Sequence, residues 1–429
     1  MTGTTVSVDA TLAAVFREEA GRLTGALTRT LGNFDVAEES VQDALLTALE
    51  RWPREGIPQR PGAWLATVAR NRAVDRLRRD ARYREKLAQL EGWQPSPLAD
   101  DRLRLMFTCC HPALSRQAQL ALTLRAVCGF TTAQIAHALV ASEAAIAQRL
   151  ARARRKIVTA AIPYRIPADD ELDERLTQVL TVLYLLFNEG YLTSGGPRPA
   201  RRDLAEDAAW LAAQLATLYP RQPEALGLLA LMRLHLARAD ARFDVHGELV
   251  LLSRQDRSRW DRAMIAEAVA TLERAARLGR PGPYQLQAAI VACHTDAASW
   301  AATDWPQILA LYDLLLALTP SPVVRLNRAV AVRHVAGARA ALEEIEALAP
   351  TLDGYHLFHA IRGELLVELG RREQARAAEL RALALTGNRA ERSLLEQRLI
   401  LLEDSGGRPP GPPCQPAPSV SDDLPSRSG

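Results

Sequence analysis

The sequence predicts an all-α protein: two small helical domains, the second containing a helix-turn-helix, followed by a long helical extension. Apolar residues recur at helical spacing through most of the chain, and stretches rich in Pro and Gly separate these segments. The 429 residues, 48% of them apolar, are enough for two or three domains with their own cores. No run approaches 18 uninterrupted apolar residues and no secretion signal is evident, so we expect a soluble, cytoplasmic protein without a membrane partner.

The net charge of +3 conceals an asymmetry between the two parts of the chain. Residues 1–165 contain 24 basic and 16 acidic residues, a net charge of +8. The remaining 29 basic and 34 acidic residues give a net charge of −5. An excess of positive charge in the N-terminal part favours a polyanionic partner there, such as nucleic acid.

Two helices are predicted at the N-terminus. Residues 9–31 place apolar side chains on one face, and Gly32 is expected to end this helix. Asp35 is expected to cap the second helix, with Glu38 completing a capping box. The second helix also has an acidic and polar face that is expected to point outward, formed by Glu38, Glu39, Gln42 and Asp43.

A loop rich in Pro and Gly, residues 53–62, precedes a strongly basic third helix, which is expected to begin at Pro61. Residues 60–86 contain nine basic and three acidic residues. A basic helix beside such a loop can hold phosphates next to a space for an unstacked base. The alternative for this helix alone is a charged, solvated surface.

The helix-turn-helix is predicted within residues 131–157, after a linker at 88–100 and two supporting helices at 101–108 and 117–128. Thr131 and Gln134 have capping-box spacing, and Ser142 is placed to cap the second helix. That helix has an apolar stripe of Ile146, Leu150, Ala153 and Ile157. Its other side carries Gln148, Arg149, Arg152, Arg155 and Lys156, which suits a DNA major groove. The alternative is an amphipathic helix with a solvated basic face.

Residues 168–403 are expected to form a helical extension, which the segment 162–167 (IPYRIP) separates from the DNA-binding part. Residues 168–300 form its first domain. Within 301–403, Ala310, Ala341 and Ala375 lie 31 and 34 residues apart, close to the tetratricopeptide period. Stacked repeats of this kind offer a concave surface for a protein or peptide, although a plain helical bundle is the alternative. Residues 404–429 are rich in Pro and Gly and are expected to be disordered.

Three blocks together resemble extracytoplasmic-function (ECF) sigma factors of the sigma-70 family, which are bacterial transcription initiation factors. They are DVAEESVQDALLTAL, AWLATVARNRAVDRLRR and TTAQIAHAL with IAQRLARARRKI. The resemblance implies region 2 at residues 9–87, region 4 at 101–161, and RNA polymerase core and promoter DNA as partners. It implies polymerase contacts with the β′ clamp helices and the β flap, those on the second helix made by Glu38, Glu39, Gln42 and Asp43.

The resemblance also implies two sets of DNA contacts. The −10 element would be contacted by Arg60, Trp64, Asn71, Asp75, Arg76 and Arg79. The −35 element would be contacted by Ser142, Gln148, Arg149, Arg152, Arg155 and Lys156. Val140 stands where the family usually has glycine in the helix-turn-helix, which leaves the exact set of base-contacting residues open.

The extension resembles that of one group of these sigma factors, which carries a tetratricopeptide-like C-terminal part. The blocks FNEGY, GELVLL, QDRSRWDR and GPYQLQAAI, at 187–191, 247–252, 255–262 and 282–290, match that group. The resemblance implies regulation through the extension. We hypothesise that these blocks form the interface between the extension and the DNA-binding part.

Two other classes of protein are alternatives to a sigma factor. A helix-turn-helix regulator with a tetratricopeptide sensor would bind operators without polymerase, and it would need neither residues 38–43 nor residues 60–79. An enzyme is disfavoured because none of the common catalytic motifs occurs. Cys109-Cys110-His111 lacks a second ligand pair at zinc spacing, so we expect neither a metal nor another cofactor.

Overall fold

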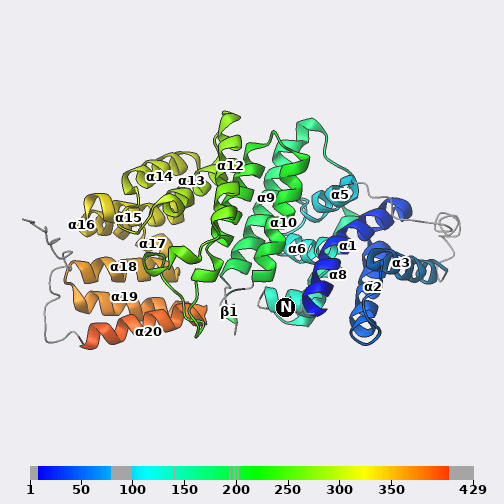
Figure 1. Cartoon of the computed structure of the whole chain (residues 1–429), viewed down its shortest axis with the longest axis horizontal. Coiled ribbons are helices and arrows are strands. Elements are labelled where there is room, and N and C mark those ends of the chain that lie inside the picture. Colours follow the sequence, from blue (N-terminus) through cyan, green and yellow to red (C-terminus); the bar gives the residue numbers. More distant parts are fainter. Residues whose placement is uncertain are drawn as a thin grey trace, which may run out of the picture.

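The computed structural model describes residues 8–78, 99–139, 141–192, 195–196, 200 and 202–404. Helices dominate these ranges, which confirms the all-α prediction. In the same ranges the only strands are β1 (Gly195–Gly196) and β2 (Gly387–Asn388), which pair in parallel. Figure 1 shows an elongated molecule with the N-terminal helices at one end and the last helices of the extension at the other. None of the described helices is both long and apolar enough to span a membrane.

The first bundle consists of α1 (Val8–Leu31), α2 (Phe34–Glu55) and α3 (Pro61–Arg78). Gly32 follows α1 with φ of 58°, and α3 begins at Pro61, both as predicted. The predicted cap of α2 is wrong. Asn33 caps this helix by accepting a hydrogen bond from the Val36 amide, because its side chain stands just before the first helical turn. Asp35 lies inside the helix.

The second bundle consists of α5 (Ala99–Cys109), α6 (Arg116–Leu122), the π-helical turn η2 (Thr123–Val127), α7 (Thr132–Ala138) and α8 (Glu143–Thr159). Gly129 follows η2 with φ of 78°, a conformation that favours glycine. The predicted linker at 88–100 lies outside the described residues, except for its last two, with which α5 begins.

The extension can be divided into two parts. Its first part contains α9 (Asp169–Tyr191), α10 (Arg202–Leu218), α11 (Pro223–Leu236), η3 (Ala239–Ala241), η4 (Leu252–Arg254), η5 (Arg257–Arg259), α12 (Arg262–Arg277) and α13 (Pro283–Asp296). Its second part, here called the solenoid, contains α14 (Trp305–Leu318), α15 (Pro322–Ala336), α16 (Ala338–Glu346), α17 (Ala349–Leu352), α18 (His356–Glu368), α19 (Arg372–Leu385) and α20 (Arg389–Asp404).

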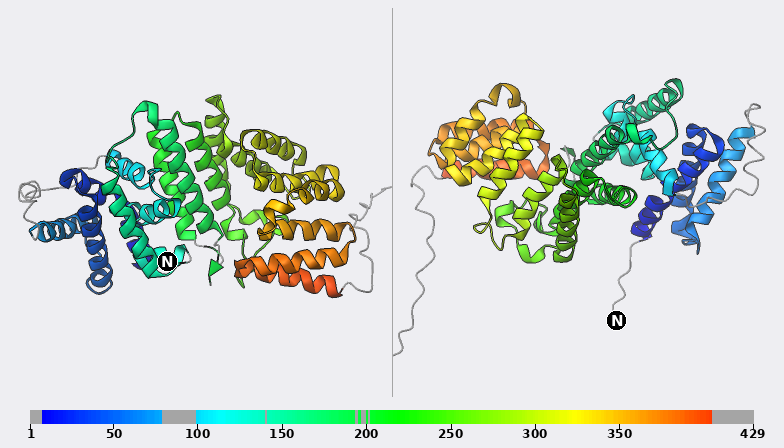
Figure 2. Two further views of the ribbon diagram at one scale, coloured as in Figure 1. Left: turned by 180° about the vertical axis from the view of Figure 1, so that it is seen from behind. Right: turned by 90° about the horizontal axis from the view of Figure 1, so that it is seen from above.

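Consecutive solenoid helices pack against one another, as Figure 2 shows from two further sides. Ala341 and Ala375 are fully buried, as expected of small residues at helix crossings. Ala310, the corresponding residue of α14, is exposed. Asp404 ends α20 and does not begin a tail, and the predicted disorder of residues 405–429 lies outside the described part of the chain.

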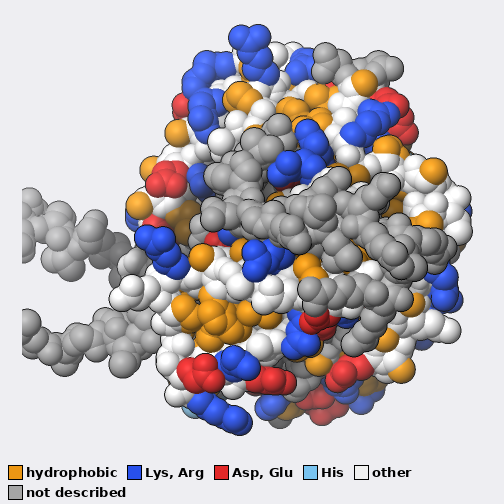
Figure 3. Space-filling view, turned by 90° about the vertical axis from the view of Figure 1, so that its right-hand side faces the viewer, with side chains coloured by type: hydrophobic (Ala, Val, Ile, Leu, Met, Phe, Trp, Pro, Cys, Tyr) orange, Lys and Arg blue, Asp and Glu red, His pale blue; other side chains and the backbone are white. Residues whose placement is uncertain are grey.

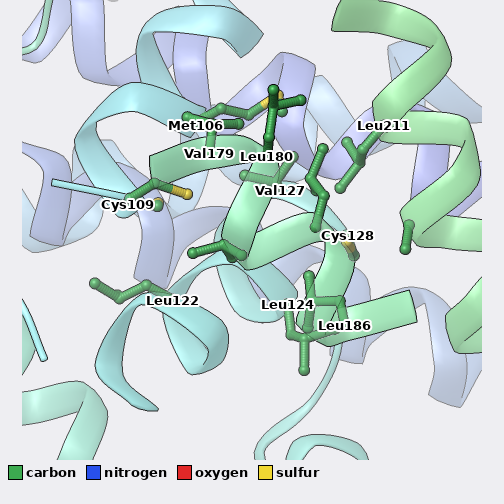
Figure 4. Packing of buried hydrophobic residues seen from close by; sticks show 14 of the residues in the cluster. Met106, Cys109, Leu122, Leu124, Val127, Cys128, Val179, Leu180, Leu186 and Leu211 are labelled. Carbon is green, nitrogen blue, oxygen red and sulfur yellow. The ribbon is translucent and has the colours of Figure 1, made fainter. Parts of the chain in front are cut away.

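The second bundle and the start of the extension share one hydrophobic core. Met106, Leu124 and Val127 of the second bundle pack together with Val179 of α9 and Leu211 of α10 (Figure 4). The expectation that residues 162–167 separate the two parts is therefore wrong. Ile162 is buried in this same core, so this segment is itself part of the packing.

The first bundle has a core of its own, built around Leu23, Leu27, Leu45 and Trp52. Its helix α1 packs against α5 and η2 of the second bundle. The Tyr164 hydroxyl lies 2.9 Å from the carbonyl oxygens of both Gly25 and Asp101, so it holds α1 next to the start of α5. The two bundles thus have separate cores, and they meet along α1 and α2.

Candidate nucleic-acid interface

Helices α7 and α8 have the local structure predicted for a helix-turn-helix. The Thr131 hydroxyl accepts a hydrogen bond from the Gln134 amide at 3.2 Å, and the Gln134 side chain accepts one from the Thr131 amide at 2.8 Å. This confirms the capping box, which satisfies two amides at the start of α7. Ser142 caps α8 as predicted, its hydroxyl accepting a hydrogen bond from the Ala145 amide. Val140, in the turn, lies outside the described residues.

One side of α8 is buried and the other carries the predicted DNA-binding residues. Ile146, Leu150, Ala153 and Ile157 are buried, which confirms the apolar stripe. Ser142, Gln148, Arg152, Arg155 and Lys156 are exposed, and Arg149 is half-buried. Within the described part of the chain, no carboxylate pairs with Arg149, Arg152, Arg155 or Lys156. This face is therefore cationic and available to an anionic partner.

Three of these residues also border a hollow in the surface. Arg149, Arg152 and Lys156 line it from α8, and residues 113–115, 117 and 118, at and before the start of α6, also line it. The hollow has a volume of about 470 Å³. Cationic side chains around a hollow on this scale suit the phosphates of a nucleic-acid backbone.

Arg154 lies on the same helix but points toward α2 and not toward solvent. Its guanidinium lies 2.9 Å from Glu38 Oε2 and 2.9 Å from Glu39 Oε1, and Asp35 Oδ1 is 3.5 Å away. Arg154 is not among the residues predicted from the sequence. Its position in the sequence could have indicated a paired role, because Arg154 lies four residues after Leu150, at the edge of the buried stripe. A charged side chain at such an edge needs a partner.

The predicted outward-facing set on α2 is only partly exposed. Glu38 and Gln42 are 0% and 2% exposed because the second bundle covers them. Arg125 donates to Glu38 Oε1 at 2.7 Å, and the Gln42 side chain donates to the Arg125 carbonyl oxygen at 2.8 Å. The expectation of an outer face is therefore wrong for Glu38 and Gln42.

Burial raises the pKa of Glu38, while the charges of Arg154 and Arg125 act in the opposite direction. Arg125 was also not predicted to have a role, although it is the only charged residue between Gln117 and Gly129. A lone charge in an apolar segment is expected to have a buried partner. Sequence spacing alone does not say which carboxylate that partner is.

Glu39 and Asp43 remain partly exposed on α2. Both pair with Arg76 of α3, at 3.3 Å and 2.9 Å respectively. Arg76 was assigned to −10 contacts and the two carboxylates to polymerase contacts. The structure brings these residues together, so the two predicted surfaces adjoin along the α2–α3 contact.

The other residues predicted for the −10 element lie around α3. Arg60, Asn71 and Asp75 are exposed, the first in the turn before α3 and the others along the helix. Trp64 is half-buried and packs edge-on against Trp52 at 5.3 Å, so it also supports the first bundle. Arg79 lies outside the described residues.

The end of the molecule formed by the first bundle is mixed in charge. On the part of this face that undescribed residues do not cover, Lys and Arg side chains lie beside acidic and apolar ones (Figure 3). The unpaired cations of α8 are therefore the more distinctive anion-binding feature.

Three family models match the chain. Sigma-70 region 2 matches residues 15–83, sigma-70 region 4 matches 104–157, and a family of unknown function (DUF6596) matches 175–276. The first match covers α1–α3 and the second covers most of the second bundle. The third covers the first part of the extension, from α9 to α12.

Similar proteins fall into two kinds. The uncharacterized protein R00370 of Rhizobium meliloti is 46% identical over 389 residues, which cover 87% of this chain and 92% of that protein. The ECF RNA polymerase sigma factor SigL of Mycobacterium tuberculosis is 30% identical over 164 residues, 37% of this chain and 92% of SigL. SigK of Mycobacterium sp. (strain KMS), also an ECF sigma factor, is 31% identical over 157 residues, 33% of this chain and 78% of SigK. No solved structure matches the chain.

The two sigma-70 regions occur in order on the two bundles, and SigL is matched over nearly its whole length. The helix-turn-helix with its unpaired cationic face lies within the second of these regions. The chain therefore belongs to the ECF sigma factors of the sigma-70 family, and it carries in addition a helical extension beyond the two sigma-70 regions.

Proposed function

We propose that this sigma factor binds core RNA polymerase through α2, recognises the −10 element through α3 and its preceding loop, and recognises the −35 element through α8. The observation that carries this proposal is the face of Gln148, Arg149, Arg152, Arg155 and Lys156, whose cations have no carboxylate partner among the described residues. A duplex supplies both phosphates and base edges to such a face. On this proposal the protein acts by binding and not as an enzyme.

The polymerase contacts are proposed to involve the β′ clamp helices at α2 and the β flap at the second bundle. Glu39 and Asp43 are partly accessible for the first of these contacts. Glu38 and Gln42 are covered by the second bundle, so they can take part only after the bundles separate.

We further propose that the extension regulates initiation. Because α9 and α10 share a core with the second bundle, a structural change in the extension can reach α8 through direct packing. A hollow of about 870 Å³ lies where η4 faces the solenoid, and Leu252, Trp300 and His334 are among the residues that line it. A protein or peptide bound there would be the regulatory partner.

We restrict the hypothesis that four sequence blocks join the extension to the DNA-binding part to the first block, which lies on α9. Phe187, in the first block, belongs to the shared core. Trp260, in the third, packs in a separate cluster with Leu231 and Ile265 inside the extension. This supports α9 as the element in contact with the second bundle.

Run-off transcription with purified core polymerase tests the proposed function. The sigma factor is expected to direct transcripts from a promoter that core polymerase alone does not use. Binding to duplex DNA without any polymerase-dependent transcript would favour the alternative, an operator-binding regulator with a tetratricopeptide-like sensor.

A further inference from the structure

We propose that the free protein is autoinhibited: the second bundle covers the polymerase-binding face of α2, and the two bundles must separate before core polymerase can bind. This inference rests on the proposed role of α2 in polymerase binding. The relevant surface, here called the bundle interface, consists of α1 and α2 on one side and α5, η2 and α8 on the other.

The first support is a buried ionic cluster at the centre of this interface. Glu38 of α2 is fully buried, with Arg125 of η2 at 2.7 Å and Arg154 of α8 at 2.9 Å. Both arginines come from the second bundle, so separation would break both ion pairs at once. A buried carboxylate that loses its partners is strongly unfavourable unless it becomes solvated or finds new ones. Polymerase contacts or water would have to replace them.

The second support is close backbone packing along α1. A Cβ atom on Gly25 would lie 2.8 Å from the Asp101 carbonyl oxygen and 2.9 Å from the Tyr164 hydroxyl. Arg29 of α1 also pairs with the buried Asp101 at 3.0 Å. Glycine at position 25 therefore permits an approach that any larger residue would block. An incidental contact between two independent domains would not need such an approach.

The third support is that the bundle interface divides two separate cores. The first bundle has its own cluster of buried apolar residues, whereas the second bundle is continuous with α9–α11. Opening along the interface would therefore leave both main cores intact. Phe34 is the exception, because it belongs to the first bundle but packs into the core of the second. The extension and the second bundle would move away from α2 together, as one unit.

The substitution Gly25→Ala tests the inference in the full-length chain. Alanine is a better helix former than glycine, so α1 itself is not weakened, while the added methyl group clashes across the interface. Gly354→Ala is the matched control, because a Cβ there meets no atom within 4 Å. We expect a larger radius of gyration by small-angle X-ray scattering, and core polymerase affinity raised by roughly tenfold or more in the absence of DNA.

Arg154→Gln provides a second route to the same outcome, because it removes one of the two charges on Glu38 without adding bulk. Its control is Arg376→Gln, which breaks an exposed ion pair on α19. We expect tighter polymerase binding for Arg154→Gln and wild-type binding for the control.

Wild-type scattering and wild-type polymerase affinity in both interface variants would overturn the inference. So would an expanded molecule whose polymerase affinity is unchanged, because α2 would then not be the hidden binding face. If the interface variants expand but no form of the protein binds polymerase, the proposed function fails and the closed arrangement of the bundles stands.

Discussion

Glu379 is a carboxyl group buried on α19 within the solenoid. It is 1% exposed, and its nearest charged partner is Arg398 on α20, at 3.5 Å. Gly363 of α18 makes room for it, because a Cβ there would lie within 3.1 Å of three Glu379 atoms. Burial raises the pKa of Glu379 to about 7, and the attraction of Arg398 only partly offsets this rise.

This raised pKa predicts that the solenoid loses stability as the pH rises. At low pH Glu379 is protonated in both the folded and unfolded states. Between the ordinary pKa of 4.5 and about 7, the unfolded chain releases its proton first, which favours unfolding by up to about 3 kcal/mol. Glu379→Gln should remove this penalty and stabilise the protein at pH 8 relative to the wild type.

Urea unfolding at pH 5 and pH 8, followed by circular dichroism, measures this effect. Glu343→Gln is the control, since Glu343 is an exposed carboxyl group on α16. Equal pH dependence in the wild type and Glu379→Gln would show that Glu379 is already ionised in the folded protein at pH 5.

At the scale of elements, the basic residues of α8 point in two directions. Arg152, Arg155 and Lys156 face solvent, while Arg154 turns toward α2. The division follows from helical geometry, since Arg154 lies one turn beyond Leu150, at the edge of the buried stripe. The same helix can therefore face DNA on one side and hold the first bundle on another.

Arg152→Ala is predicted to weaken binding to −35 duplex DNA. The loss should be about 1–3 kcal/mol if Arg152 pairs with a base, and smaller if it contacts a phosphate alone. Fluorescence anisotropy at one fixed salt concentration, with native and altered −35 sequences, distinguishes the two cases. Arg165→Ala is the control, because Arg165 lies beyond α8 and pairs with Glu171. Unchanged affinity for Arg152→Ala on every duplex would remove this residue from the DNA-binding face.

At the scale of the whole molecule, the extension completes the core of the DNA-binding part. Leu176, Val179, Leu183 and Phe187 of α9 are buried in the same cluster as Leu105 and Leu124. Each large apolar side chain buried in this way contributes about 1.5–3 kcal/mol relative to exposure. Deleting the extension would therefore damage the second bundle itself, and lost promoter activity would not locate a regulatory contact.

A chain ending at residue 167 is predicted to have a less stable second bundle than the full-length protein. A chain ending at residue 300 keeps α9–α13, so its second bundle should remain folded. Thermal unfolding and binding of a hydrophobic dye compare the two truncations, and only the shorter one should bind the dye strongly at room temperature. Equal stability of the two would mean that α9 is dispensable for the second bundle.

Much of the local structure follows from the sequence because short-range physics decides it. The capping box at Thr131, the helix end at Gly32 and the start of α3 at Pro61 depend on residues within one turn, and all three predictions are confirmed. The cap at Asp35 was wrong because Asn33, two residues earlier, also suits the role. When two residues near the start of a helix can both act as its N-cap, the sequence pattern alone does not decide between them.

The sequence by itself determined the helical class and the two faces of α8, since helical periodicity and local capping specify them. The order of the two sigma-70 regions followed from the resemblance of three sequence blocks to ECF sigma factors. Only the tertiary structure decided that Glu38 and Gln42 lie beneath the second bundle, with Arg125 and Arg154 beside Glu38. Only the tertiary structure, likewise, joined α9 to the core of the second bundle. These features depend on residues that are far apart in the chain, such as Gln42 and Arg125, which are 83 positions apart. A periodic pattern specifies which face of a helix is buried but not which distant segment covers it.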